Sequence, residues 1–242
     1  MSRITLVIGA SSDIGISLIK DFDDDRLVIA HYNKSKDELC SLEDKYPSRI
    51  KPFAADLSSL KEVNHFVDNI LQTYGVPDEI VFLAAGKFNH IRFKNLEWDD
   101  FSKEIDISVK STFIILKKFL PLMAKRKKGK VVFMLSSCLF GVPPIALAHY
   151  TSVKSTLLGI VRSTAAEYAN KNVQINAVSP SMVETKFLRQ IDSKFVALVA
   201  QNHPMRRNAL PEDVTPIIRF LLSEGSDYIN GVNIPITGGS SF

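Results

Sequence analysis

Short apolar runs rich in β-forming residues alternate along this chain with longer segments of helical period, and this alternation limits the fold more than any other feature. The pattern is typical of an α/β protein in which helices cover both faces of a parallel sheet. Helices are expected between the strands, and the one at 59–74 carries a stripe that indicates core: Leu60, Val63, Phe66, Val67, Ile70 and Leu71. The predicted strands are 4–8, 27–31, 50–54, 79–83, 131–135, 173–178 and 232–236.

The bulk composition is that of one ordinary globular domain. With 242 residues, 45% of them hydrophobic and 23% charged, the chain can bury a single large core, so we expect one domain over 1–242. The net charge of +4 is spread along the chain, and the only basic cluster is the run 125–130. This distribution predicts no nucleic-acid partner. Cys40 and Cys138 lie far apart, the start lacks the form of a signal peptide, and no apolar run approaches membrane-spanning length. These observations predict a reduced, cytoplasmic protein.

The first predicted strand ends in a turn of small residues, GASSDIG at 9–15, and a helix follows. Small residues in this context let the backbone approach a pyrophosphate closely, and the helix N-terminus supplies N–H groups and a favourable dipole. The turn therefore predicts a dinucleotide site. Asp13 stands where glycine is commoner, and a carboxylate aimed at phosphate would repel it. We interpret Asp13 as a helix cap that turns toward backbone donors.

The end of the second strand bears on the choice of dinucleotide. An acidic residue there would bind the ribose hydroxyls of NAD and repel the additional phosphate of NADP. No acid stands at that strand end, and Ser12 faces it from the glycine turn, so the sequence favours NADP(H) and leaves NAD(H) open. The polar residues present instead are Tyr32, Asn33, Lys34 and Ser35.

Asp56 follows the third predicted strand directly. Its carboxylate can accept a hydrogen bond from the amino group of an adenine, or it can cap the helix that begins near Leu60. The two roles are compatible, and both are kept as expectations.

Tyr150 and Lys154 are four residues apart, which puts the phenol and the ammonium on one face of a helix. The positive charge is then expected to stabilise the tyrosinate and to depress the pKa of Tyr150. Ser137 lies thirteen positions upstream, where an apolar strand ends, and can offer a hydroxyl beside the phenol. Together these groups form an acid/base site, although a tyrosine and lysine at this spacing are by themselves common on helix surfaces.

In this order and spacing, the glycine turn, Asp56, Ser137, Tyr150 and Lys154 make the whole chain similar to the short-chain dehydrogenase/reductase family. The segments NAVSPSMVET at 176–185, HPMRRNALPEDV and INGVNIPITGG also match, and they resemble the subgroup of β-ketoacyl-acyl-carrier-protein reductases. The resemblance implies an NAD(P)-dependent oxidoreductase with a doubly wound, Rossmann-like sheet in the order 3-2-1-4-5-6-7. It also implies homodimers or homotetramers built through the long helices near 100–120 and 150–170.

The resemblance further implies a role for each site residue. Tyr150 would exchange the proton on the substrate oxygen, Lys154 would lower its pKa and bind the nicotinamide ribose, and Ser137, rather than its neighbour Ser136, would orient the carbonyl. Val183 and Thr185 would hold the nicotinamide carboxamide. The cofactor-binding set implied is Gly9, Ser11, Ser12, Asp13, Ile14, Gly15, Tyr32, Asn33, Lys34, Ser35, Asp56, Leu57, Ala84, Ala85, Gly86, Tyr150, Lys154, Pro180, Val183 and Thr185.

Three positions depart from the family pattern. Ser108 occupies the place of the asparagine that orients a water next to the lysine, and a serine can bind that water or bond back to its own helix. We count Ser108 as the fourth catalytic position, with an uncertain proton relay. The motif Asn-Asn-Ala-Gly appears as Leu83 to Gly86, and Ser181 replaces a glycine. None of these changes removes a group that performs the chemistry.

Three functions stay open. The first is a ketoreductase for an acyl thioester, including one on an acyl carrier protein whose acidic surface would meet Lys127, Lys128 and Lys171. The second is an oxidoreductase for a sugar or another small alcohol or ketone of a polysaccharide pathway. The third is a cofactor-binding scaffold without turnover.

The scattered histidines give no metal-ligand spacing. The substrate loop is expected at about 181–211, with a pocket formed by 139–145, Met182 and 186–205, including Arg189 and Gln190.

Overall fold

Seven strands pair in parallel in the order β3-β2-β1-β4-β5-β6-β7, so the predicted α/β fold, its doubly wound sheet and its strand order are confirmed. In this computed structural model, which describes residues 3–86 and 89–241, the strand ends differ from the prediction by one or two residues. Leu83 and Leu135 leave the sheet to line a cavity, and Val232 precedes the last strand. The strands are β1 (Arg3–Ile8), β2 (Arg26–Tyr32), β3 (Ile50–Ala54), β4 (Glu79–Phe82), β5 (Gly129–Met134), β6 (Val173–Pro180) and β7 (Asn233–Ile236).

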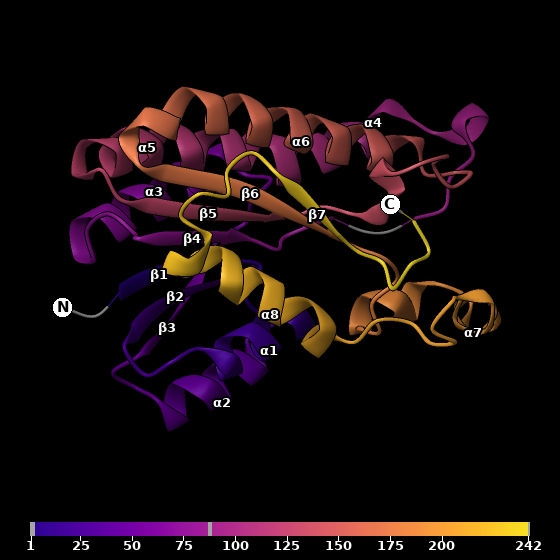
Figure 1. Ribbon diagram of the computed structural model, residues 1–242, viewed down its shortest axis with the longest axis horizontal. Coiled ribbons are helices and arrows are strands. Elements are labelled where there is room, and N and C mark those ends of the chain that lie inside the picture. Colours follow the sequence, from indigo (N-terminus) through magenta and orange to yellow (C-terminus); the bar gives the residue numbers. More distant parts are fainter. Residues whose placement is uncertain (1–2, 87–88, 242) are drawn as a thin grey trace.

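Helices cover both faces of this sheet (Figure 1). In the view of Figure 1, α3, α5 and α6 lie above the strands and α1, α2 and α8 lie below them, while α7 stands apart beyond one end of the sheet. The helices are α1 (Asp13–Asp21), α2 (Asp37–Lys45), α3 (Leu60–Thr73), α4 (Trp98–Glu104), α5 (Ser111–Arg126), α6 (Ala148–Tyr168), α7 (Ser193–Asn202) and α8 (Pro211–Leu222).

The central strands divide their side chains between two cores. Leu6 and Ile8 of β1 belong to the core under α3, α5 and α6, whereas Val7 belongs to the core under α1 and α8. Alternate residues of a strand point to opposite faces, so a strand that is apolar at every position must be covered on both sides. This explains why the strands appear in the sequence as continuous apolar runs.

The capping of α3 corrects two expectations. Ser59 is the N-cap of this helix, since its side chain accepts a hydrogen bond from the Glu62 N–H, so the interpretation of Asp56 as the cap is wrong. The carboxylate of Asp56 instead accepts from the backbone and the hydroxyl of Ser58. Leu60, expected in the core stripe, is 55% exposed because it begins the helix at its solvent side.

A π-helical segment, Ile105–Lys110, joins α4 to α5 in one long helical stretch. Such segments widen a helix locally and are frequent at functional sites. Glu104, the last residue of α4 just before this segment, and Ser108 within it are both buried. Both therefore face the interior rather than solvent.

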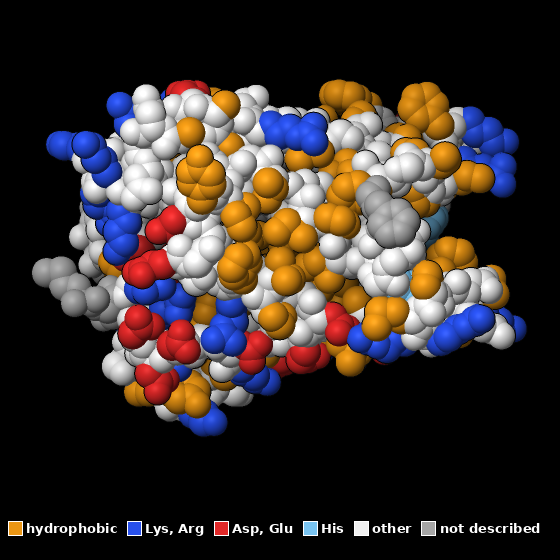
Figure 2. Space-filling view, viewed as in Figure 1, with side chains coloured by type: hydrophobic (Ala, Val, Ile, Leu, Met, Phe, Trp, Pro, Cys, Tyr) orange, Lys and Arg blue, Asp and Glu red, His pale blue; other side chains and the backbone are white. Residues whose placement is uncertain are grey.

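Exposed apolar side chains gather across the face formed by α8 and β7 (Figure 2). Phe220, Tyr228 and Val232 belong to this region and are exposed. In the described parts of the chain, no helix has the length and hydropathy needed to cross a membrane.

Candidate active site

A cavity of about 890 Å³ opens at the carboxyl ends of the central strands. In open α/β sheets, ligands bind at this edge where the strand order reverses, here between β1 and β4. Its lining draws on the glycine turn, the loops after β4, β5 and β6, and the start of α6. The predicted site residues in the lining are Gly9, Ser11, Ser12, Asp13, Ile14, Asn33, Ser35, Asp56, Leu57, Ala84, Ala85, Gly86, Ser137, Tyr150, Lys154, Pro180, Val183 and Thr185.

The glycine turn is packed too closely for side chains. Gly9 has a φ of 82°, in the left-handed region, and a Cβ there would lie 2.7 Å from the amide nitrogen of Ala84. A Cβ on Gly15 would lie 2.5 Å from the carbonyl oxygen of Ala10. The turn therefore presents bare backbone to the cavity at Gly9, whereas Gly15 lies outside the lining and packs against the turn itself.

The interpretation of Asp13 as the helix cap is wrong. Ser12 has the extended backbone of an N-cap, and its Oγ accepts from the Gly15 N–H at 3.1 Å. Asp13 is already the first helical residue, and its Oδ2 accepts from the Lys186 N–H at 2.5 Å. Lys186 also pairs with Glu38 on α2. The carboxylate thus ties the loop after β6 to the glycine turn.

His31 is a cofactor-side residue that the sequence analysis missed. Its Nδ1 accepts from the Gly9 N–H at 3.0 Å, and its Nε2 lies 3.0 Å from the carbonyl oxygen of Ala55, so the ring is the neutral Nε2–H tautomer. Burial lowers the pKa of His31 from 6.5 to about 4. The ring joins the end of β1 to the end of β3. A polar side chain in an apolar strand was the available signal.

Polar groups after β2 and acids at the start of α2 border the cavity together. Asn33 and Ser35 line the cavity, while Tyr32 and Lys34 lie at the same strand end outside the lining. Two carboxylates that the sequence analysis did not weigh, Asp37 and Glu38, also line it. Hydrogen bonds from Ser58, and to a lesser extent the charge of Lys34, hold the pKa of Asp56 below its usual value.

The tyrosine and lysine meet inside this cavity from the first two turns of α6. The Lys154 Nζ donates to the Met134 carbonyl at 2.9 Å and lies 5.6 Å from the centroid of the Tyr150 ring. Burial lowers the pKa of Lys154 to about 8, against the opposing effects of Cys138 and Glu104. Burial, with the charges of Cys138 and Glu104, also raises the pKa of Tyr150, so the expected depression of this pKa by the lysine is wrong for the isolated chain.

Both serines at the end of β5 line the cavity. A hydrogen bond between Tyr150 and the Ser136 side chain opposes the rise of the tyrosine pKa. The Ser136 Oγ also accepts from the Cys138 N–H at 3.3 Å. Ser137 begins a 3₁₀ turn beside them, and its role as the carbonyl-orienting serine stays a prediction.

Ser108 does not line the main cavity that contains Tyr150 and Lys154. It lines a separate cavity of about 10 Å³ together with Ser111, Thr112 and Met134. Met134 is the residue whose carbonyl accepts from Lys154. Ser108 is thus one residue removed from the lysine, and its part in a proton relay stays a prediction.

Glu104 is a second residue that the sequence analysis missed. Its side chain is 7% exposed, and burial raises its pKa, while Lys154 and a hydrogen bond with the Gly86 backbone lower it. The signal in the sequence was its position one helical turn before Ser108, on the face that carries Phe101 and Ile105.

The segment after β6 forms one wall of the cavity. It contains a 3₁₀ turn, Lys186–Gln190, and then α7, the one short helix expected in this loop. Phe187, Leu188 and Ile191 line the cavity with Met182, whereas Val142 and Ile145 are 92% and 83% exposed at the opposite loop. Arg189 lies outside the lining, and the side chain of Gln190 lies outside the described residues.

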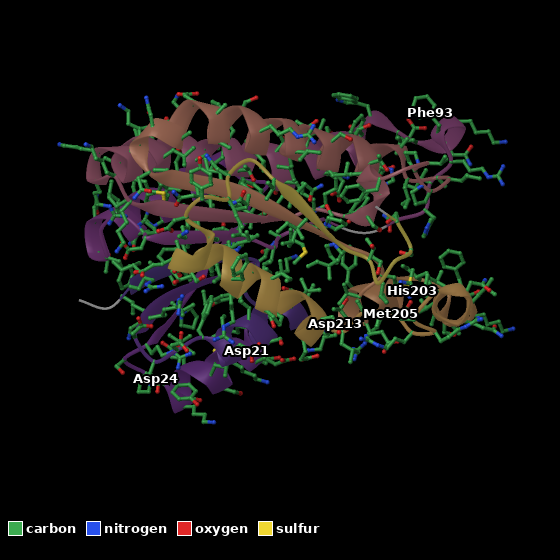
Figure 3. The ribbon with its side chains drawn as sticks, in the orientation of Figure 1. Asp21, Asp24, Phe93, His203, Met205 and Asp213 are labelled. Atoms are coloured by element: carbon green, nitrogen blue, oxygen red, sulfur yellow. The ribbon has the colours of Figure 1, made fainter. Side chains whose placement is uncertain are left out.

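A buried histidine anchors the end of this segment. The Met205 N–H donates to His203 Nδ1 at 3.1 Å, and His203 Nε2 lies 2.9 Å from the Thr237 carbonyl oxygen. Figure 3 shows His203 and Met205 on the stretch between α7 and α8, beside the C-terminal segment. The described residues contain no group of three His, Cys, Asp or Glu side chains placed to hold a metal ion.

The basic residues expected to receive an acyl carrier protein lie at the other edge of the sheet. Lys127 and Lys128 immediately precede β5, and Lys171 precedes β6, whereas the cavity opens at the carboxyl ends of these strands. Lys128 also pairs with Asp78 at 3.1 Å. Because parallel strands place their starts and ends at opposite edges of the sheet, these lysines do not flank the cavity of their own chain, and their contact with a carrier protein stays a prediction.

Comparisons with known proteins identify the family of this chain. A family model described as enoyl-(acyl carrier protein) reductase matches residues 9–241. The 3-oxoacyl-[acyl-carrier-protein] reductase FabG of Thermotoga maritima is 27% identical, over 98% of this chain and 97% of that protein. The acetoacetyl-CoA reductase of Allochromatium vinosum is 29% identical, over 99% and 98%.

Solved structures give the same fold. ElxO with NADP bound is 27% identical over 99% of this chain and 98% of its own, with a TM-score of 0.87. Levodione reductase, at 22% identity over 98% and 96%, has a TM-score of 0.89 and is similar in fold. The family match and the shared fold lead to one conclusion. The chain belongs to the short-chain dehydrogenase/reductase family and is an NAD(P)-dependent oxidoreductase of that family.

Proposed function

We propose that this protein is an NADPH-dependent ketoreductase that reduces a 3-oxoacyl thioester. The observation that carries the proposal is that Tyr150, Lys154 and the serines after β5 open into the same cavity as the glycine turn. The names of the relatives, a 3-oxoacyl-carrier reductase and an acetoacetyl-CoA reductase, support a thioester as the substrate class.

The residues present fit a dinucleotide. The turn from Gly9 to Gly15 offers bare backbone, since side chains at either glycine would overlap neighbouring backbone atoms. The first turn of α1 adds N–H groups and a partial positive charge for a pyrophosphate. Asn33 and Ser35 would contact the adenosine ribose, and Val183 with Thr185 would hold the carboxamide. NADP(H), when bound, supplies or accepts the hydride.

The chain's own groups then handle the proton. In reduction, the Tyr150 hydroxyl donates its proton to the substrate oxygen as negative charge develops there, and in oxidation the tyrosinate takes it back. The Lys154 ammonium, fixed on the Met134 carbonyl, stabilises the tyrosinate that this leaves. Ser137 donates a hydrogen bond to the same substrate oxygen and sets its orientation. The apolar side chains of Phe187, Leu188 and Ile191 exclude water around the reacting carbon.

The proposed cofactor preference rests on the polar end of β2 and on the NADP-bound neighbour. Asp37 and Glu38 oppose it, because carboxylates beside the ribose would repel a 2′-phosphate. Fluorescence titration of the purified protein with NADPH and NADH tests the balance directly. Tighter binding of NADPH is expected, and tighter binding of NADH would replace NADP(H) by NAD(H) in the proposal.

The substrate is tested by following NADPH absorbance with acetoacetyl-CoA, a carrier-bound 3-oxoacyl thioester and a set of keto-sugars. Turnover of the thioesters supports the proposal, whereas turnover of keto-sugars alone would favour the polysaccharide alternative. Loss of every reductase activity in Tyr150→Phe without loss of the protein's cellular role would favour a scaffold.

Carrier docking has its own test. Lys127→Glu is expected to leave the rate with acetoacetyl-CoA unchanged, and Lys61→Glu on α3 gives the same charge change as a control. If Lys127→Glu selectively slows the carrier-bound substrate, the carrier docks at the far edge of the sheet and must serve the cavity of a second copy. Light scattering would show whether the protein forms the proposed homodimer or homotetramer.

A further inference from the structure

The cavity that fits a dinucleotide carries more acids than bases. A ligand with phosphate groups therefore meets an excess of negative charge, so the position of each cation decides where a phosphate can bind. In the described part of the chain, the carboxylates that line the cavity are those of Asp13, Asp37, Glu38 and Asp56, and the ammonium groups are those of Lys154 and Lys186.

The two ammonium groups serve different parts of the cavity. Lys154 lies beside Tyr150, where the acid/base chemistry is proposed. Lys186 begins the 3₁₀ turn after β6, and its Nζ pairs with the carboxylate of Glu38 in the first turn of α2. Asn33, proposed to contact the adenosine ribose, lines the cavity just before α2. Lys186 is therefore the lining cation on the ribose side.

Backbone contacts fix the point from which Lys186 reaches across the cavity. Its N–H donates to Asp13 Oδ2 at 2.5 Å, and its Nζ lies 3.6 Å from Asp13 Oδ1. Just before it, the Glu184 N–H donates to the Ala209 carbonyl at 2.8 Å, and the Ala209 N–H donates to the Met182 carbonyl at 3.0 Å. The lysine thus extends from a segment anchored both to the start of α1 and to the stretch before α8.

The pair between Lys186 and Glu38 is exposed enough to exchange partners. The two side chains are 53% and 47% exposed. A pair at such exposure contributes little to stability, so its loss costs little. A phosphate monoester carries more negative charge than a carboxylate at neutral pH and has more acceptor oxygens. It can therefore replace Glu38 as the partner of the ammonium.

We propose that Lys186 determines the specificity for the 2′-phosphate of the cofactor: its ammonium neutralises Glu38 in the free protein and binds the phosphate instead when NADP(H) enters. The proposal rests on the NADP(H) preference proposed above, and it explains how that preference can exist beside the acids of α2. The pyrophosphate offers the same chemistry, but the N–H groups at the start of α1 already serve it. Lys34, at the end of β2, is a competing cation, although it lies outside the lining.

The test is the ratio of the dissociation constants for NADH and NADPH, measured by fluorescence titration. Lys186→Gln keeps the backbone N–H that Asp13 accepts and removes the charge. NADPH should then bind about tenfold more weakly, while NADH binding changes by less than about twofold. Lys186→Arg, which retains the charge, should keep most of the preference. Lys20→Gln, at the exposed far end of α1, makes the same charge change outside the cavity and should leave both constants unchanged.

Three results would overturn the proposal. An equal loss of affinity for NADH and NADPH in Lys186→Gln would assign the ammonium to the pyrophosphate. Unchanged affinities would mean that the contact with Glu38 is a surface ion pair only. A lower ratio in Lys34→Gln but not in Lys186→Gln would assign the phosphate to Lys34.

The exchange of partners also predicts that two substitutions are not additive. Glu38→Gln frees the ammonium and removes a repelling carboxylate, so NADPH should bind about two- to fivefold more tightly. In the Lys186→Gln background no ammonium is released, and the gain should shrink. An equal gain in both backgrounds would mean that Glu38 acts on the phosphate by repulsion alone, and the exchange would be wrong.

These measurements are independent of turnover, so they stand if the thioester activity proposed above is not found. A wild-type protein that binds NADH more tightly would refute the proposed cofactor. The change of the ratio in Lys186→Gln would still decide the role of the lysine, because it compares each variant with wild type.

Discussion

Two buried polar clusters face the same cavity, and they are built in opposite ways. Around His31, each ring nitrogen has a backbone partner and the ring is neutral. Around Tyr150, the tyrosine, Lys154 and Glu104 are each displaced from their usual pKa. Buried groups with all their partners fix a structure, whereas groups whose pKa values are pushed by burial and by one another are suited to move protons. The first cluster thus shapes one side of the cavity, and the second is the one to which the proposed function assigns the proton transfer.

Tyr150→Phe should distinguish the two clusters most clearly, because it is expected to lower kcat without affecting stability or cofactor affinity. It removes the proton donor and keeps the ring, so kcat should fall by about 100- to 10,000-fold. The melting temperature and the affinity for NADPH should change little, because the glycine turn and His31 are untouched. Steady-state kinetics, thermal unfolding and fluorescence titration measure the three quantities. A loss of less than about tenfold would mean that another group supplies the proton.

The His31 cluster should instead affect how the free energy of unfolding depends on pH. The pKa of His31 is lower in the folded protein than in the unfolded chain. The contribution of His31 to stability is therefore fully present above pH 6.5 and is lost as the pH falls toward about 4. The loss amounts to about 3 kcal/mol of the free energy of unfolding. Urea unfolding at about pH 7 and about pH 4.5 measures most of it.

The matched variants are His31→Gln, which should be less stable at neutral pH and should lack most of this pH dependence, and the exposed His65→Gln, which should behave as wild type. If His31→Gln loses stability with falling pH as steeply as wild type, the acid sensitivity belongs to other groups.

The contrast between these clusters also explains what the sequence could and could not predict. Strand order and the gathering of Gly9, Ser137, Tyr150 and Lys154 followed from the family resemblance, and the strands themselves from apolar runs. His31 and Glu104 were missed, because in the sequence each is one polar residue within an apolar pattern. Their importance depends on partners such as Gly9 and Gly86 that are distant along the chain.

The same limit applies to charge. Spacing placed Tyr150 and Lys154 on one helix face but said nothing of how deeply α6 would bury them, and burial reversed the expected direction of the tyrosine pKa. Likewise, the sequence predicted that α1 and α3 each have a polar N-cap but not which residue it is. Asp13 and Asp56 were chosen from residue type, whereas the backbone conformation makes Ser12 and Ser59 the caps.

Lys154 should give a smaller effect, seen in the pH profile. With a pKa of about 8, the ammonium is present at neutral pH and is lost as the pH rises. The rate of reduction should therefore decline by about tenfold for each pH unit above that value, as expected for an essential protonated group. Initial rates at saturating cofactor across this range test it. A rate that stays level to well above pH 8 would mean that the bound complex holds Lys154 protonated more strongly than the chain alone does.

Ser108→Ala should give the smallest fall in kcat. It tests whether Ser108 belongs to the cluster around Tyr150. The serine is buried next to a cavity of about 10 Å³, roughly the lower limit for one water, and it brings no charge to Lys154. Losing one neutral hydrogen bond costs about 1 kcal/mol, so kcat should fall by no more than about fivefold. Ser108→Asn, which installs the family's amide, serves as the comparison. A loss near that of Tyr150→Phe would place the proton path through Ser108. A small loss would mean that a water held by this hydroxyl is not needed to return a proton to Tyr150 in this chain.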